Sequence, residues 1–290
     1  MAVRQQRGKG LTVAGTSAID LEKIEVDCLL EAVYHRYGFD FREYAPASLR
    51  RRVNRRVKLE GLPSISALQD HLLRDPDVMN RLLLDLSINV TAMFRDPTCH
   101  LAFREKVVPL LRTYPFTRIW VAGCSTGEEV YSLAILLEEE SLYDRSRIYA
   151  TDINEEVLER ARLGVFPLSK MQEYTRNYIG AGGTREFSDY YTSGYDGAAF
   201  DRSLMRNVVF AQHNLAADRS FNEFHAIVCR NVMIYFERSL QQRVFELFDD
   251  SLARLGILSL GHKESLRTSP HADKYKELDS AERLYRKLKK

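Results

Sequence analysis

The stretch Arg118-Ile-Trp-Val-Ala-Gly-Cys-Ser-Thr-Gly-Glu-Glu129, followed by Tyr149-Ala-Thr-Asp152, decides the fold class. An apolar strand leads into a loop that contains Gly123 and Gly127, a helix begins directly after it, and a second apolar segment ends at Asp152. In α/β folds that bind adenosine-type cofactors, small residues let the backbone approach the ligand, and an acid at the tip of the next strand holds ribose hydroxyls. Asp152 comes 25 residues after Gly127, close to the usual interval of about 20. The sequence therefore predicts a cofactor site at the ends of these strands.

The glycines do not follow the dinucleotide-binding pattern. The loop is Gly-Cys-Ser-Thr-Gly instead of G-x-G-x-x-G, and Glu128 and Glu129 open the predicted helix. Pyrophosphate binds at the positive N-terminal end of a helix, where two carboxylates would repel it. Two acids favour a cofactor without phosphate and with a positive charge, such as S-adenosylmethionine, which has a sulfonium, an amino group and ribose hydroxyls. The alternative is a strand, turn and helix without a ligand, since an acidic first turn also favours the helix dipole.

Length and composition are those of a globular protein with one or two domains. The chain has 290 residues, 45% of them hydrophobic, and a formal charge of +2, so no overall field attracts nucleic acid or a membrane. There is no apolar run of about 18 residues to span a membrane, and residues 1–16 have the composition of a disordered tail, not of a secretory signal. The cysteines form no C-x-x-C pair and the histidines no H-x-x-x-H pattern. We expect a cytoplasmic protein with reduced thiols and no metal.

Residues 17–88 show only helical patterns, which predict a small all-helical N-terminal domain. The first helix is expected to bury an apolar stripe of Leu21, Ile24, Cys28 and Ala32, with Leu29 as a further candidate. Apolar residues also recur at helical spacing after three helix-starting positions, Pro46, Ser64 and Pro76. Residues 89–117 are then a linker and a helix.

From Arg118 onward, apolar strands alternate with helical stretches. The predicted strands are 119–121, 148–150, 208–210, 226–228 and 257–260. Such alternation predicts an α/β fold with a largely parallel, doubly wound sheet over residues 118–290. Residues 181–207 break the rhythm and are rich in Gly, Tyr and Asp. We predict a small β-insertion there, with an antiparallel piece.

Polar residues occur where a ligand cleft is expected. Asn89, Thr91 and Arg95 fall at the junction of the two regions, and clefts are common at domain junctions. A capped linker before the next helix is the alternative, and the sequence does not choose between them.

Two further polar groups follow predicted strands. Arg230, Asn231 and Tyr235 lie just beyond one strand, and His213 and Asn214 end the preceding one. Ligands in open α/β sheets bind beyond the carboxyl ends of strands, where the second pair could contact an adenine edge. The alternative for the first group is a strand end with a turn-forming asparagine.

The second helix has one strongly basic set of residues: Arg50, Arg51, Arg52, Arg55, Arg56 and Lys58. Like charges at i and i+4 repel by about 0.2–0.5 kcal/mol per pair, and a solvated face normally mixes signs. We interpret this helix as a docking face for an acidic partner, either a carboxylate-rich protein surface or a nucleic-acid backbone. A basic helix packed on nearby acids is the alternative.

Six motifs, taken in order, resemble those of one family, the chemotaxis receptor methyltransferases of the CheR type. They are Asn89–Arg95, Gly123–Tyr131, Ala150–Ile153, His213–Leu215, Cys229–Phe236 and Gly261–Leu266. The resemblance runs from about Ile24 to Tyr285. It implies a Rossmann-like methyltransferase domain, a helical N-terminal domain and a bacterial S-adenosylmethionine-dependent protein-glutamate O-methyltransferase that acts in chemotaxis signal transduction.

The resemblance also implies roles for individual residues. The residues expected to bind the cofactor, with Gly123 added from the loop, are Asn89, Thr91, Arg95, Gly123, Glu129, Asp152, Asn214, Leu215, Asn231 and Val232. Arg95 and Tyr235 would face the reacting methyl group. The basic helix within 17–88 would dock on the cytoplasmic helical bundle of a methyl-accepting chemoreceptor. The implied enzyme is a monomer that neither binds nucleic acid nor inserts into a membrane.

The chemistry of the substrate agrees with this reading. A glutamate side chain, with an ordinary pKa near 4.3, is already ionised at neutral pH, so it needs alignment more than a base. Two other functions are weighed against it: a nucleic-acid methyltransferase, which the basic helix favours, and a non-catalytic cofactor-binding module. The low net charge opposes the first, and polar residues at every expected site oppose the second.

Overall fold

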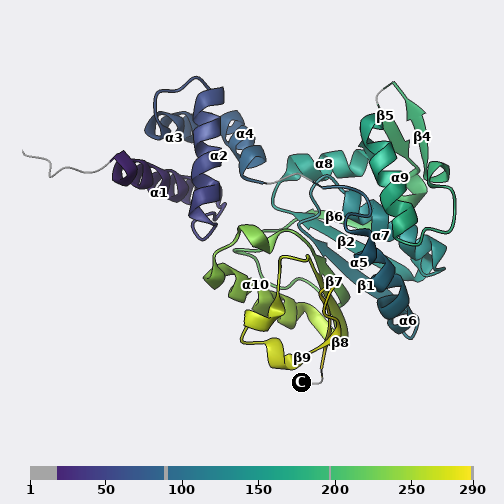
Figure 1. The fold of residues 1–290 in the computed structure, drawn as a ribbon. Coiled ribbons are helices and arrows are strands. Elements are labelled where there is room, and N and C mark those ends of the chain that lie inside the picture. Colours follow the sequence, from purple (N-terminus) through teal and green to yellow (C-terminus); the bar gives the residue numbers. More distant parts are fainter. Residues whose placement is uncertain (1–17, 88–90, 196, 289–290) are drawn as a thin grey trace, which may run out of the picture.

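The computed structural model describes residues 18–87, 91–195 and 197–288. A helical domain lies beside a larger α/β domain, and the chain passes from one to the other after α4 (Figure 1). The helical domain consists of α1 (Ala18–Tyr37), α2 (Pro46–Leu59), α3 (Ile65–Arg74) and α4 (Pro76–Leu86). Prolines occupy the first turns of α2 and α4, where a missing N–H costs nothing. Ser64 caps α3 by accepting a hydrogen bond from the Ala67 N–H.

The buried face of α1 differs from the predicted stripe, of which only the further candidate, Leu29, is buried. Leu21 and Ile24 are 57% and 53% exposed, and Cys28 is also exposed. The residues that α1 buries in the helical core are Val26, Leu29, Leu30 and Val33. The helix has apolar residues on more than one face, and packing against α3 selects the one that is buried.

The α/β domain is built on a seven-stranded sheet of order β6-β2-β1-β7-β8-β10-β9. Five adjacent strands are parallel to one another: β1 (Thr117–Ala122), β2 (Ser146–Asp152), β6 (Val208–Gln212), β7 (Phe224–Cys229) and β8 (Leu252–Leu260). The antiparallel edge is formed by β9 (Tyr275–Asp279) and β10 (Leu284–Lys287). The strand order reverses at β1, because β2 lies on one side and β7 on the other. This switch point is where α/β sheets bind ligands.

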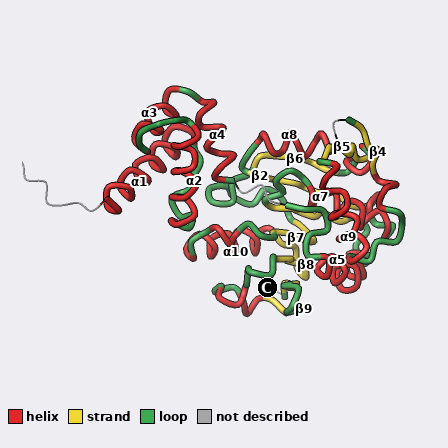
Figure 2. The backbone as a smooth tube through the Cα atoms, turned by 45° about the horizontal axis from the view of Figure 1, so that its top comes forward, coloured by secondary structure: helices red, strands yellow, loops and turns green. Residues whose placement is uncertain are grey.

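Helices cover both faces of the sheet, and Figure 2 shows α10 on one side and α5, α7 and α9 on the other. Alternate residues of β1 enter the two cores: Trp120 packs with α10, and Val121 packs with α7. The helical elements of this domain are α5 (Pro97–Ala102), a π-helical turn (Phe103–Val107), α6 (Val108–Leu111), α7 (Glu128–Glu139), α8 (Glu155–Leu163), α9 (Met171–Gly180) and α10 (Arg238–Ser251). The predicted Rossmann-like fold class is therefore confirmed.

A second, three-stranded antiparallel sheet accounts for the predicted β-insertion. Its order is β3-β5-β4, from β3 (Val165–Phe166), β5 (Gly197–Phe200) and β4 (Tyr191–Gly194). Strands β4 and β5 lie within 181–207, whereas β3 comes earlier. Phe166 and Phe200 pack edge-on against Tyr131 of α7, which anchors the small sheet on the larger domain.

The helical domain is joined to the loop after β7 by backbone contacts. Tyr44 and Phe236 form an antiparallel bridge. The Ala45 N–H donates to the Tyr235 carbonyl at 2.8 Å, and the Glu237 N–H donates to the Glu43 carbonyl at 2.8 Å. The start of α2 and the segment that carries Tyr235 therefore form one packed unit.

Candidate active site

The predicted site residues surround one hollow at the carboxyl ends of β1, β2 and β7. The predicted residues that line it are Thr91, Arg95, Gly123, Glu129, Asp152, Asn214, Leu215, Asn231, Val232 and Tyr235. Asn89, also predicted, lies outside the described residues. The hollow encloses about 960 Å³ of space between protein atoms, a volume that includes open solvent. The helical domain contributes Tyr44, Leu86 and Ser87 to its wall, so both domains form it.

Both glycines of the β1 loop have left-handed backbone, with φ +73° at Gly123 and +97° at Gly127. A Cβ on Gly123 would meet Val232 Cγ2 at 2.5 Å, and one on Gly127 would meet the Ala161 Cβ at 2.8 Å. Both distances are shorter than real carbon contacts, so the neighbouring protein atoms themselves require glycine here. Gly123 lets the β7 loop pack against the β1 loop, and Gly127 lets α8 pack beside the start of α7.

Asp152 ends β2 with a carboxylate that faces the hollow, and only 8% of the residue is exposed. One oxygen accepts from the Ser125 N–H at 2.9 Å and the other from the Asn154 N–H at 3.1 Å. Burial raises the pKa of Asp152, and these hydrogen bonds only partly oppose the shift. Each carboxylate oxygen has a second acceptor position, which suits the two neighbouring hydroxyls of a ribose.

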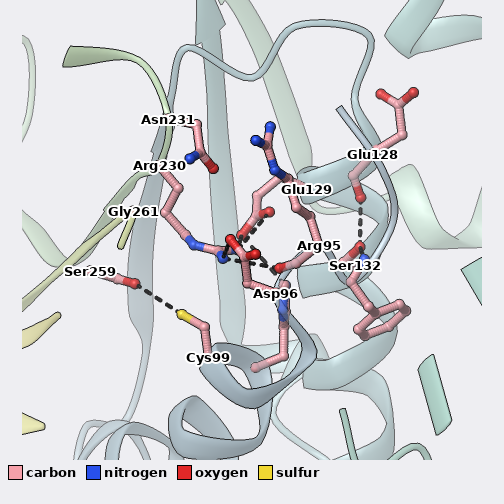
Figure 3. A network of polar contacts seen from close by, with 12 residues as sticks. Arg95, Asp96, Cys99, Glu128, Glu129, Ser132, Arg230, Asn231, Ser259 and Gly261 are labelled. Carbon is pink, nitrogen blue, oxygen red and sulfur yellow. Dashed lines mark hydrogen bonds and ion pairs between the residues drawn. The ribbon is translucent and has the colours of Figure 1, made fainter. Parts of the chain in front are cut away.

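The two acids at the start of α7 have different environments, which corrects the interpretation that both face the cofactor. Glu128 is buried, accepts from the Thr126 hydroxyl at 2.6 Å and lies 3.4 Å from the Tyr174 hydroxyl. Burial raises the pKa of Glu128. Only Glu129 lines the hollow, and Figure 3 shows the two carboxylates pointing apart.

Glu129 is held by a buried guanidinium. Arg230 Nη1 donates to both Glu129 oxygens at 3.1 Å, while its Nη2 donates to the Arg95 carbonyl and to Asp96 Oδ2, both at 2.9 Å (Figure 3). Burial by itself would raise the pKa of Glu129, but Arg230 and His100 outweigh it and lower the pKa to about 2. Arg230 therefore keeps Glu129 ionised and fixes the backbone of Arg95. The sequence placed Arg230 among the polar residues at the expected cleft, and it does line the hollow, but the sequence did not predict its contact with Glu129. Its signal was a charge directly after a buried apolar strand.

Tyr235 is placed by the helical domain. Besides the bond from Ala45 to its carbonyl, its ring lies 5.2 Å from the guanidinium carbon of Arg52. Arg52 also donates to the Leu86 carbonyl at 2.5 Å, and burial lowers its pKa. Arg52 was predicted to belong to the docking face, but its side chain is partly buried and packs inward on Tyr235, which favours a role within the protein.

Most of the other basic residues of α2 are paired with acids. Arg56 is largely buried and contacts Asp85 and Glu60, at 2.5 and 3.1 Å, so it is a second correction to the docking face. Arg55 pairs with Asp85 at 2.9 Å but stays exposed, and Arg50 lies 3.8 Å from Glu22. These pairs fit the alternative of a basic helix packed on nearby acids. Arg51 and Lys58 are exposed, and within the described ranges neither has an ion pair.

Metal-binding clusters and membrane-spanning helices are absent from residues 18–87, 91–195 and 197–288. No group of three or more His, Cys, Asp or Glu side chains there could hold a metal ion. No helix in the described ranges is both long enough and apolar enough to cross a membrane. Cys99, Cys124 and Cys229 are buried free thiols, and Cys28 is exposed.

Comparison with known protein families identifies the family of this chain. The family pattern described as "CheR methyltransferase, SAM binding domain" matches residues 89–282, and "CheR methyltransferase, all-alpha domain" matches residues 24–87. The chain belongs to the CheR methyltransferase family. Its cofactor is S-adenosylmethionine, as predicted, and the prediction of a CheR-type chemotaxis methyltransferase is confirmed.

Several CheR relatives are similar over nearly their whole length. "Putative methyltransferase Cher3" of Pseudomonas putida is 49% identical over 91% of this chain and 97% of its own. "Chemotaxis protein methyltransferase 2" of Pseudomonas aeruginosa is 34% identical over 83% of this chain and 86% of its own. Among solved structures, the N-methyltransferase NodS from Bradyrhizobium japonicum is 13% identical, with a TM-score of 0.37, over 68% of this chain and 97% of its own.

The donors and acceptors of the hollow fit the CheR cofactor. His213 Nε2 lies 3.2 Å from the Arg219 carbonyl, while its buried Nδ1 has no hydrogen-bond partner among the described residues. If Nε2 carries the proton, Nδ1 presents a lone pair, which is what an adenine amino group needs. Burial lowers the pKa of His213, which favours this neutral form at neutral pH. Together with the carboxylates of Asp152 and Glu129, this gives the hollow acceptors that suit the three donor groups of the cofactor: the adenine amine, the ribose hydroxyls and the ammonium group.

Proposed function

We propose that this chain transfers the methyl group of S-adenosylmethionine to glutamate side-chain carboxylates of a bacterial methyl-accepting chemoreceptor, giving glutamate methyl esters. One observation carries the proposal. Arg95 and Tyr235 line the same hollow as Asp152 and Glu129, and the wall is completed by the helical domain whose second helix carries exposed positive charge. A carboxylate that enters from an acidic partner would meet the methyl-donor site at this wall.

The residues expected to hold the cofactor act by hydrogen bonding and packing. Asp152 accepts from the ribose hydroxyls, Glu129 accepts from the amino group, and His213 accepts from the adenine amine. The neutral contacts come from Asn89, Thr91, Gly123, Asn214, Leu215, Asn231 and Val232. The bound cofactor supplies an electrophilic methyl group, so the reaction yields a methyl ester and S-adenosylhomocysteine.

Arg95 and Tyr235 orient the incoming glutamate. The glutamate is ionised at neutral pH without help, so neither residue has to remove a proton. Arg95 draws the carboxylate in, while its own backbone is held by Arg230. Tyr44 and Phe236 shield the approach from water. Positioning of this kind supplies as much as about 7–11 kcal/mol of a reaction barrier.

The exposed part of α2 is proposed to dock on the receptor's cytoplasmic helical bundle. Arg51, Arg55 and Lys58 form this docking surface, while Arg50, Arg52 and Arg56 are engaged within the protein. A small basic patch suits local carboxylates on a protein surface better than a duplex, which needs an extended basic footprint. A nucleic-acid substrate is therefore an outcome of the test below, not a second proposal.

The experiment offers both substrate classes to the enzyme. Purified protein is incubated with methyl-tritiated S-adenosylmethionine and either a cytoplasmic fragment of a chemoreceptor or total transfer RNA. We expect label in the receptor fragment only, and a fragment whose methylatable glutamates are changed to alanine should stay unlabelled. Label in RNA without label in the receptor would overturn the proposal. Calorimetric binding of the cofactor without transfer to either substrate would favour a non-catalytic module.

A further inference from the structure

Glu264 is a buried carboxylate that lies outside the hollow. It follows β8 within the Gly261–Leu266 motif, and only 4% of the residue is exposed. Its two oxygens accept four backbone N–H groups. Oε2 accepts from Gly261 at 2.7 Å and Asn231 at 3.0 Å, and Oε1 accepts from Val232 at 2.9 Å and Met233 at 2.8 Å. No residue among those predicted for the site has this many backbone partners in the described ranges.

These hydrogen bonds join the loops that follow two neighbouring strands. Strands β7 and β8 are paired to their ends, at Cys229 and Leu260, and beyond that point no sheet hydrogen bond holds the two loops together. Glu264 replaces the missing sheet contact. Convergent N–H groups normally form a binding site for an external anion, but here a side chain of the protein fills it.

The geometry of the β7 loop depends on this carboxylate. Asn231 has φ +61°, in the left-handed region that residues other than glycine rarely adopt. Gly261 must be glycine for the same contact, because a Cβ there would come within 2.8 Å of both the Asn231 nitrogen and Glu264 Oε2. The left-handed turn and the missing side chain together bring the three N–H groups onto Glu264.

The same loop forms one wall of the hollow. Asn231 and Val232 line it, and Val232 is the residue that contacts Gly123 of the β1 loop. Met233 begins the short 3₁₀ turn Met233–Tyr235, so the last of the four hydrogen bonds also fixes the start of the turn that carries Tyr235. Glu264 itself does not line the hollow.

We propose that Glu264 is a positioning residue for methyl transfer, which holds Asn231 and Val232 against the cofactor and sets the direction of Tyr235. The inference rests on the assignment of those residues to the cofactor and the substrate. Glu264→Gln tests it well, because an amide has only one acceptor oxygen and directs an NH₂ group toward N–H donors. Glu277→Gln is the matched control, since Glu277 pairs with Arg267 and lies on β9, which β8 and β10 separate from β7 in the sheet.

Amide hydrogen exchange followed by mass spectrometry measures how firmly Glu264 holds residues 231–233, and it needs no substrate. In Glu264→Gln, exchange in residues 231–233 should accelerate by about tenfold or more, while 225–228 and 257–260 keep wild-type protection. The cofactor dissociation constant, measured by calorimetry, should rise by about tenfold. At saturating cofactor, kcat for the receptor fragment should also fall, and KM for the fragment should not change. Glu277→Gln should match wild type in all four measurements.

Two results would overturn the proposal. One is wild-type exchange in residues 231–233. The other is faster exchange with cofactor affinity and kcat unchanged, which would make Glu264 merely structural. If Glu264→Gln does not fold, Gly261→Ala retains the carboxylate and separates it from the Asn231 nitrogen. Gly261→Ala should give the same faster exchange in residues 231–233 and the same loss of cofactor affinity. Wild-type exchange and affinity in this variant would also contradict the proposal. Hydrogen exchange and cofactor affinity are measured without a receptor. They therefore test the role of Glu264 independently of the proposed substrate.

Discussion

Arg230 donates from one guanidinium nitrogen to both carboxylate oxygens of Glu129, at 3.1 Å each, and its side chain is only 3% exposed. The two residues lie 101 positions apart in the chain. They bring together the loop after β7 and the first turn of α7, and the other half of the guanidinium holds the Arg95 backbone. Arg230 therefore supports both Glu129, which is proposed to bind the cofactor, and Arg95, which is proposed to contact the substrate.

Removing this support should destabilise the protein strongly. Arg230→Met removes the guanidinium that holds the Glu129 charge and leaves only the weaker contact with His100 at 3.4 Å. The expected cost is up to about 3–5 kcal/mol in the free energy of unfolding, to be measured by urea denaturation. Arg230→Met combined with Glu129→Gln should recover much of the loss. A single variant as stable as wild type would show that the pair contributes little.

The same pair predicts a pH dependence. The folded pKa of Glu129, about 2, lies below the ordinary value of 4.5. Stability from the ion pair is therefore fully present above pH 4.5 and is lost as the pH falls towards 2. Urea unfolding at a series of pH values should show this loss in wild type and not in Glu129→Gln. Equal slopes in the two proteins would contradict the assignment.

Asp152→Ala should weaken cofactor binding by more than about tenfold, because a hydrogen bond to a charged acceptor contributes about 1.5–3 kcal/mol. Since burial raises the pKa of Asp152 above 3.8, wild-type affinity should begin to fall on acidification at a pH above that value. Calorimetry across pH measures both effects, with the exposed Asp144→Ala as control. Unchanged affinity in a folded Asp152→Ala protein would remove the ribose assignment.

Gly123→Ala should reduce cofactor affinity while the fold persists. The new Cβ would lie 2.5 Å from Val232 Cγ2 at a φ of +73°, so the β1 and β7 loops must move apart. Gly194→Ala is the control, since no atom lies within 4 Å of its Cβ position. Adding Val232→Ala should relieve the contact and recover part of the affinity. If Gly123→Ala and Gly194→Ala bind the cofactor equally well, the two loops do not need this close approach.

Reversing the exposed charges of α2 should impair receptor methylation and leave cofactor affinity unchanged. The structure favours Arg51→Glu with Lys58→Glu for this test, because Arg55 already pairs with Asp85. The defect should appear as slower association and should shrink with added salt, since the screening length falls from about 10 Å at 0.1 M to about 3 Å at 1 M. Arg147→Glu with Arg254→Glu gives the same charge change on other exposed residues. Full receptor methylation by the α2 variant at low salt would contradict the docking role and indicate that this helix face is simply exposed to solvent.

The strands and the location of the site could be predicted from sequence because both follow local patterns. The apolar segments around Trp120, Tyr149 and Ile227 became β1, β2 and β7, and the polar residues after them gathered at one edge of the sheet. The sequence also predicted that two adjacent acids open α7. Only the fold decides that Glu129 faces the hollow and that Glu128 does not.

What the sequence could not provide depends on contacts between distant segments. Arg51 and Arg52 are adjacent, and on a helix they point about 100° apart, so only packing against Tyr235 distinguishes the buried one. Strand β3 has two residues, too few for an alternating pattern to show. Glu264 binds backbone N–H groups, which every residue but proline offers, so no partner residue type marks it in the sequence.

The most direct test of the central claim is the alkali lability of the transferred methyl group. A chemoreceptor fragment labelled by this protein with methyl-tritiated S-adenosylmethionine is treated with mild alkali, and volatile methanol is counted. Glutamate methyl esters hydrolyse under these conditions, so the label should be released as methanol. A folded Arg95→Ala protein should transfer at least about tenfold less label, because Arg95 orients the carboxylate. Label that stays on the fragment after alkali would mean transfer to nitrogen or another stable acceptor, and would contradict glutamate O-methylation.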